Sequence, residues 1–213
     1  MSIAEKLTTL SENMPKVFEA GINWICSYAY QVAELFYKVA FPEGCALDLA
    51  LPRIDPNLQS MFRTVTGLRQ LRLRLPLEKV YNGSYFAYYC TSIVTLILPE
   101  GIRFSSFANF ANRCSSLERV EGALDLSEST SNENCFNSCP MLQEVRFVPG
   151  SIYASLHFRN SDKLSPETVA SILAGLADVN DRETQSLTLH ATIREQLTPE
   201  QLAAVAAKNW EVQ

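Results

Sequence analysis

The segment Phe110-Ala-Asn-Arg-Cys114-Ser-Ser-Leu117-Glu-Arg-Val120 has a spacing of phenylalanine, cysteine, leucine and an aliphatic residue that recurs on both sides of it. The pattern lies upstream in residues 86–96 and, with one residue deleted, downstream in residues 136–145. The phenylalanines of the three stretches are Phe86, Phe110 and Phe136, and their cysteines are Cys90, Cys114 and Cys139. A nearly constant period of roughly 25 residues indicates a chain that winds into stacked, similar coils.

Short alternating stretches keep the same period and predict one strand in each coil. Residues 47–51 and 71–75 alternate leucine with other residues, and a proline follows each stretch. Further apolar stretches begin one period later each time, at Leu96, Val120 and Val145. We therefore predict the α/β repeat class, as a right-handed leucine-rich-repeat solenoid with a parallel strand ladder.

Residues 1–41 are predicted to be an N-terminal helical cap or attachment segment. An apolar stripe with helical spacing marks residues 3–14, and residues 22–40 keep such a spacing until Pro42 and Gly44. Repeat arrays need a cap that shields their open end from water. An attachment helix for a larger assembly is the alternative.

Residues 42–213 are predicted to form the solenoid itself, with repeat coils in 42–160 and two helix–strand capping units in 161–213. Ser165 and Thr198 each precede a proline and a glutamate, which is the composition of a helix start. Strands are expected after each helix, in residues 186–190 and 210–212.

Charge and hydropathy exclude two classes of partner from the prediction. The chain has 213 residues with 18 basic and 23 acidic side chains, a net charge of −5, which gives no reason to expect a nucleic-acid partner. Residues 22–41 are too polar for a transmembrane segment. The N-terminus lacks the features of a secretory signal.

The residues that could carry chemistry do not form a catalytic pattern. Three of the six cysteines, Cys90, Cys114 and Cys139, fall on the repeat period, which favours a buried column of reduced thiols. The only histidines are His157 and His190, and neither belongs to a metal-binding or hydrolase motif. We predict no metal, no cofactor and no enzymatic activity.

A binding surface is predicted on the outward face of the strands. If the leucines of residues 71–75 point into the core, the residues between them point to solvent. The same register in the neighbouring strands gives the candidate binding residues Arg72, Arg74, Ile97, Arg119, Glu121, Glu144 and Arg146. Such a face is either a solvated surface of weak ion pairs or a recognition surface for a protein, peptide or glycan.

Several stretches resemble a known family. The rhythm Phe-x-x-x-Cys-x-x-Leu-x-x-Leu-x-Leu-Pro of residues 86–99 resembles the BspA-like leucine-rich repeats of bacterial surface and phage-encoded proteins. Residues 164–212 are similar to the terminal region of many such proteins from gut bacteria and their prophages. Residues 3–21 are similar to the start of phage tail-associated and other minor structural proteins.

The resemblance implies a non-enzymatic recognition or adhesion module that binds a protein or a cell-surface glycan. Such a module belongs to a prophage tail or to a bacterial surface. The sequence leaves the localisation open: because no signal peptide is visible, we expect a protein that is virion-associated, or cytoplasmic before assembly, with the cell surface as the alternative. A structural component of a phage particle, using residues 1–40 to contact other phage structural proteins, is the rival reading, and an uncharacterised hydrolase is the third.

Overall fold

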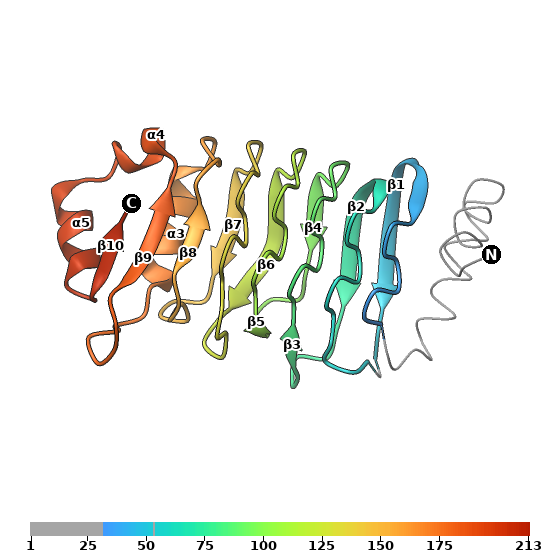
Figure 1. The fold of residues 1–213 in the computed structure, drawn as a ribbon, viewed down its shortest axis with the longest axis horizontal. Helices are drawn as coiled ribbons and strands as arrows, with labels where there is room; N and C mark the ends of the chain where they lie inside the picture. The colour runs from blue at the N-terminus through green and yellow to red at the C-terminus, as the bar shows by residue number, and fades with distance from the viewer. Residues whose placement is uncertain (1–31, 53) are drawn as a thin grey trace.

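Parallel strands stacked side by side run along the length of the described chain (Figure 1). The computed structural model describes residues 32–52 and 54–213. Within these residues the strands are β1 (Ala40–Ala50), β2 (Thr66–Arg74), β3 (Val80–Asn82), β4 (Thr95–Ile97), β5 (Ile102–Ser106), β6 (Arg119–Asp125), β7 (Glu144–Phe147), β8 (Leu156–Phe158), β9 (Gln185–Leu189) and β10 (Trp210–Val212). The helices are α3 (Pro166–Gly175), α4 (Ala191–Arg194) and α5 (Pro199–Ala206).

One face of the molecule is a parallel ladder formed by β1, β2, β4, β6 and β7. Leu47 pairs with Leu71, Leu71 with Leu96, and Leu96 with Val120, so the predicted strand positions and their register are confirmed. All four side chains are buried. The sequence period is therefore the length of chain that returns to the next strand, and we call each such length a coil.

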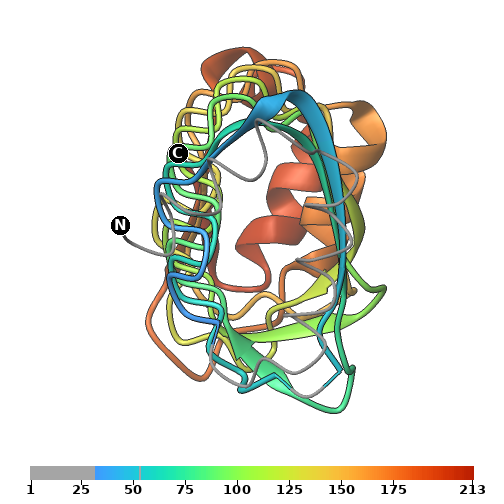
Figure 2. The ribbon, with the colours of Figure 1, turned by 90° about the vertical axis from the view of Figure 1, so that its right-hand side faces the viewer.

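The sheet curls because β6 belongs to two faces. Arg119 at its start pairs with β4 and β7, whereas Leu124 and Asp125 at its end pair with β5, which in turn pairs with β3. The strands of this sheet thus bend around a shared core as a half-barrel. Seen along the stack, the strands form one wall and stacked turns form the opposite wall (Figure 2).

The wall of turns is built from phenylalanines that stack from coil to coil. Ring centres lie 4.9 Å apart for Phe36 and Phe62, and 5.1 Å apart for Phe86 and Phe110. Backbone hydrogen bonds join the same coils, such as the one from Phe62 N–H to the carbonyl of Phe86 at 2.9 Å. Phe136 stacks at 5.4 Å on Phe158 in β8, so the sheet β8–β9–β10 continues this column toward the C-terminus.

The turns themselves use a left-handed backbone twice in each coil. The pairs lie four positions apart and comprise Glu34 and Lys38, Ser60 and Thr64, Tyr85 and Tyr89, Asn109 and Arg113, and Asn134 and Ser138. Their φ angles lie between 53° and 64°, a region that side chains other than glycine seldom occupy. Repetition of the same two positions in successive coils gives this wall one uniform backbone.

The periodic cysteines are confirmed as a buried column of thiols. Cys90, Cys114 and Cys139 form no disulfide, and their S–H groups donate to the carbonyls of Phe62, Ala87 and Ala111. Burial raises the pKa of Cys114 to about 12. A thiol with so high a pKa is a poor nucleophile and behaves as a small apolar side chain.

The helix starts predicted in the C-terminal region are confirmed. The Ser165 hydroxyl accepts the N–H of Thr168, and Thr198 with Gln201 forms a reciprocal capping box. The following strands β9 and β10 are also found, although β9 ends at Leu189 and His190 caps the short helix α4.

The predicted fold class is wrong. A leucine-rich-repeat α/β solenoid would return through a helical or comparable segment in each coil, whereas the described chain before Ser165 contains no helix and returns through turns and short strands. The structure is instead a curled half-barrel of parallel strands, and its described helices are three short ones near the C-terminal end. The division into residues 1–41, 42–160 and 161–213 stays a prediction.

The N-terminal helical cap is not found within the described residues. Residues 1–31 lie outside them. Residues 33–38 form turns and β1 begins at Ala40, so the part of the predicted helix that covers residues 32–40 is wrong. Phe36 stacks on Phe62, which makes this stretch another coil. Val32 and Phe36 have helical spacing because the paired turns also place buried residues four positions apart.

Candidate functional site

An acidic hollow of about 700 Å³ lies on the strand face where β4, β6 and β7 meet the start of α3. Its floor is formed by apolar side chains and backbone of the strands. Its wall carries charged side chains from four consecutive coils, Glu100, Glu121, Glu144, Arg146 and Glu167.

The shape of this hollow depends on Gly122. Its φ of +91° is a conformation that favours glycine, and a Cβ at this position would lie 2.3 Å from the carbonyl oxygen of Leu98. The pairing of β6 with β7 shifts register between Arg119 and Ala123, on either side of this glycine. The missing side chain therefore lets β6 approach the preceding coil at the bend.

The first turn of α3 closes the other end of the hollow. Thr168 accepts the N–H of Val145 through its hydroxyl, at 3.2 Å, and Ser171 accepts the N–H of Phe147 at 3.0 Å. These contacts hold the helix against β7 in the place of a further strand. Glu167 consequently follows Glu144 along the row of acidic side chains.

The hollow carries more negative than positive charge. Arg146 forms an ion pair with Glu100 at 3.0 Å, and the same carboxylate oxygen accepts the N–H of Ala123 at 3.1 Å. Glu121, Glu144 and Glu167 are exposed, and none forms an ion pair with a residue in the described part of the chain. Three carboxylates are thus available to a cationic group that enters the hollow.

A second, apolar hollow of about 490 Å³ adjoins the first. Ile97 and Leu98 line both, so the two hollows lie side by side at β4. Leu77 stands at the apolar hollow with 48% of its surface exposed, beside Pro52, Pro76 and Pro99. An exposed leucine among prolines is a site where an apolar side chain of a ligand would leave water.

The structure brings most of the candidate binding residues together. Ile97, Glu121, Glu144 and Arg146 line the acidic hollow, and Arg72, Arg74 and Ile97 line the apolar one. Arg74 also forms an ion pair with Asp48 at 2.9 Å. Arg119 is exposed on β6 and pairs in register with Thr95 and Glu144, but it lines neither hollow. A binding role for all seven stays a prediction.

Sequence reasoning missed Glu100, Glu167 and Leu77. Glu100 and Leu77 each follow a Leu-Pro pair at the end of a strand, so the repeat period itself could have indicated them. Glu167 carries no such signal, because its position in the hollow follows from the packing of α3 against β7.

Both histidines serve structural hydrogen bonds. The Nδ1 atom of His157 accepts the N–H of Asn134 at 2.9 Å, and the Nδ1 atom of His190 accepts the N–H of Thr192 at 3.3 Å. Burial lowers the pKa of His157, which favours the neutral ring that accepts this bond. Among residues 32–52 and 54–213, no group of three or more histidines, cysteines and carboxylates is placed to hold a metal ion.

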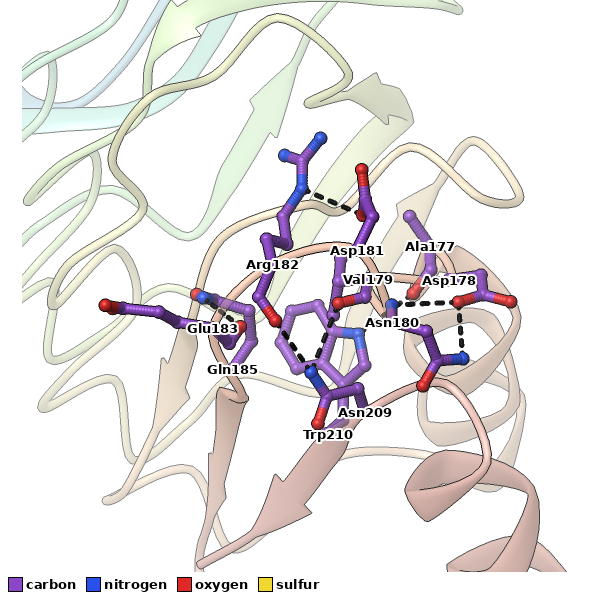
Figure 3. Close-up of polar contacts among 10 residues, drawn as sticks. All are labelled: Ala177, Asp178, Val179, Asn180, Asp181, Arg182, Glu183, Gln185, Asn209 and Trp210. Carbon is purple, nitrogen blue, oxygen red and sulfur yellow. Dashed lines mark hydrogen bonds and ion pairs between the residues drawn. The ribbon is translucent and has the colours of Figure 1, made fainter.

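A second acidic segment, residues 178–183, is held by local hydrogen bonds (Figure 3). The side-chain amide of Asn209 donates to the carbonyls of Val179 and Arg182, at 3.2 and 3.0 Å. Asp178 accepts from the backbone and side chain of Asn180. These bonds fix the loop against the start of β10. The polar groups of the loop are thus used in hydrogen bonds within the protein, and we do not count the loop as a binding site.

The helices described by the structure are all too short or too polar to cross a membrane. The chain matches no protein-family model, no curated protein and no solved structure, so its resemblance to BspA-like repeats stays a prediction and its function is inferred from the two hollows.

Proposed function

We propose that the protein is a non-enzymatic recognition module that binds a cationic segment of a partner protein on the face formed by β2, β4, β6 and β7. The observation that carries this proposal is that an acidic hollow and an apolar hollow lie side by side and share Ile97 and Leu98. A segment with a lysine or arginine next to an apolar side chain fits both at once.

The two hollows contribute differently to binding. Glu121, Glu144 and Glu167 attract a cationic segment and orient it, which raises the association rate and excludes acidic partners. The surface around Leu77 removes an apolar anchor from water, which is the main source of affinity at protein interfaces. Binding therefore requires both features in the same segment.

Rigidity of the face also favours recognition. Strands β2, β4 and β6 have a parallel neighbour on both sides, and β7 has β6 on one side and α3 on the other. The close approach at Gly122 leaves little freedom to the bend. A surface that is already in its binding conformation loses little conformational entropy when a ligand is bound. The mechanism is complementarity of shape and charge.

The biological setting follows from the resemblance described for residues 3–21, 86–99 and 164–212. It supports a receptor-binding component of a prophage tail or an adhesin of a bacterial surface, with a surface protein as the partner. In the rival case the cationic segment belongs to another structural protein of a phage particle. The same face is used in both cases.

The test uses two fluorescein-labelled peptides, one with four Lys-Leu repeats and one with four Glu-Leu repeats. We expect the protein to bind the lysine peptide, with an affinity that falls as salt is added, and not the glutamate peptide. Changing Glu121, Glu144 and Glu167 together to glutamine keeps their shape and should weaken binding at least tenfold, about 1.4 kcal/mol.

Changing Glu183, Glu195 and Glu211 together to glutamine is the matched control, because it removes the same number of charges from exposed positions outside both hollows. This variant should bind the lysine peptide as the unchanged protein does. Equal binding of the two peptides, or equal loss of binding in the control, would rule out the acidic hollow as the recognition site.

A further inference from the structure

The wall of turns, opposite to the strand face, presents an aromatic ring at a position that is polar in the other coils. The second left-handed residue of the successive coils is Lys38, Thr64, Tyr89, Arg113 and Ser138. Tyr89 has a φ of 61° and 48% of its surface is exposed. The left-handed backbone is common to all five coils, so the exposed ring is what distinguishes Tyr89. A half-exposed aromatic side chain gains little from burial, which points to a role outside folding.

Tyr89 borders a shallow depression of about 430 Å³ that runs across neighbouring coils. Polar groups of three types face the same depression, namely the guanidinium of Arg113, the hydroxyls of Thr91 and Ser138, and the amide of Asn160. Asn160 donates to the Ser138 hydroxyl at 3.3 Å, so these two groups are held beside each other. Arg113 is exposed and forms no ion pair with any residue that the structure describes.

The ring of Tyr89 rests on a cluster of aromatic side chains. Its centre lies 6.4 Å from that of Tyr88, with 30° between the planes, and Tyr88 lies 5.6 Å from Tyr85. The guanidinium of Arg63 lies 5.3 and 5.4 Å from the centres of these last two rings and 5.6 Å from that of Tyr37. Cation–π contacts of this kind stabilise the cluster of Tyr37, Tyr85 and Tyr88, and the ring of Tyr89 packs beside this cluster.

We propose that this depression is a binding site for an oligosaccharide. The exposed ring offers a flat apolar face to the C–H groups of one sugar, and the phenolic hydroxyl remains free to reach water or ligand. Arg113, Ser138 and Asn160 offer donors and acceptors to the hydroxyl groups of the sugars that follow. A few convergent polar groups beside an apolar surface are what a small polar ligand requires.

The length of the site selects an oligosaccharide over a single sugar. Tyr89, Arg113, Ser138 and Asn160 belong to four successive coils. Neighbouring coils are spaced as strands are, so the row spans three steps, or about 14 Å. A single hexose on Tyr89 would not extend to Ser138 and Asn160 at the far end of the row.

A printed array of defined oligosaccharides, followed by calorimetric titration of the strongest binder, tests the site. We expect at least one oligosaccharide to bind and the corresponding monosaccharide to bind at least tenfold more weakly. Tyr89→Phe should change the affinity less than threefold because it keeps the ring, whereas Tyr89→Ala and Arg113→Ala should each reduce it at least tenfold.

Two further variants separate binding from folding. Tyr89→Asn removes the ring but places a residue that tolerates the left-handed backbone, so it should fold and still lose the sugar. Leu77→Ala, on the strand face, should bind the sugar as the unchanged protein does. Absence of binding on the whole array, or full binding by Tyr89→Asn, would overturn the proposal.

The site is independent of the strand face, and competition shows this. The lysine–leucine peptide should leave the affinity for the oligosaccharide unchanged, because the acidic and apolar hollows that bind this peptide lie on the strand face, opposite to the wall of turns. Displacement of the sugar by this peptide would refute the location proposed here, whereas failure of the peptide to bind would contradict only the strand-face proposal.

Discussion

Thr168 closes the edge of the seven-stranded sheet at Val145. Its hydroxyl accepts the N–H of Val145 at 3.2 Å and donates to the carbonyl of Gln143 at 2.8 Å. A parallel ladder otherwise ends in a row of unpaired backbone groups that can recruit another strand. Helix α3 thus ends the ladder, because its side-chain hydroxyls form hydrogen bonds with the backbone groups at the edge of β7. The Ser171 hydroxyl likewise accepts the N–H of Phe147.

Thr168→Val should destabilise the protein although it keeps the shape of the side chain. The N–H of Val145, a buried residue, would be left without a partner, and one such unsatisfied group costs about 1 to 3 kcal/mol. The carbonyl of Gln143 would lose the Thr168 hydroxyl but would still accept the N–H of Ser165, at 2.9 Å. Urea unfolding followed by circular dichroism measures the loss. Thr192→Val, at an exposed position of α4, should change the free energy of unfolding by less than about 0.5 kcal/mol.

Phe110→Ala should lower the free energy of unfolding by about 3 to 5 kcal/mol through the cavity it leaves. The ring is fully buried and stacks between Phe86 and Phe107, at 5.1 and 4.2 Å. Arg72→Ala on the strand face should have little effect, because its side chain is exposed. Similar losses for both variants would mean that the two faces of the coil are assigned wrongly.

Gly122→Ala should destabilise the protein more than Gly101→Ala. Both glycines have a positive φ, so both variants strain the backbone, but only at Gly122 does a Cβ meet the neighbouring coil. The difference between the two melting temperatures isolates the close approach to Leu98. The variant at Gly122 should also bind the lysine–leucine peptide more weakly, since it displaces one wall of the acidic hollow.

The stability of the protein should fall as the pH is lowered through 6.5, in part because of His157. Burial is the main cause that lowers its pKa in the folded state from the ordinary 6.5, while Glu133 opposes and Arg159 supports this shift. At a pH between the lowered pKa of His157 in the folded protein and 6.5, the unfolded chain binds more protons than the folded protein does. The free energy of unfolding therefore rises with pH in this range, and the whole contribution of His157 is present above pH 6.5.

The slope due to one histidine cannot exceed about 1.4 kcal/mol per pH unit. Urea unfolding of the unchanged protein and of His157→Gln across this range measures it by difference. The variant should have the shallower dependence on pH. Parallel curves would show that protonation of His157 does not oppose the hydrogen bond from Asn134.

Local rules account for what could be predicted. The alternating leucines of residues 47–51 and 71–75 require a buried side, which determines the strands and their register. The caps at Ser165 and Thr198 depend only on residues within one turn of helix. The same strand register, which the sequence alone indicates, places Ile97, Glu121, Glu144 and Arg146 together.

Features that depend on packing between coils could not be predicted. Val32 and Phe36 are spaced as in a helix, and only the stacking of Phe36 on Phe62 shows that they belong to a pair of turns. The curl of the sheet follows from β6 pairing with different strands at its two ends. Glu167 lines the acidic hollow because α3 packs against β7. The residues around Glu167 in the sequence do not indicate this tertiary contact.

The regular turn column also gives the protein a route by which its binding sites could change length. Each coil pairs with the next through the same backbone groups, so an in-frame duplication of one coil would add one row to both walls. Every older row would keep its own geometry while the available span grows by about 4.8 Å. Ligands of different length could thus be accommodated by changing the number of coils, with no redesign of the existing ones.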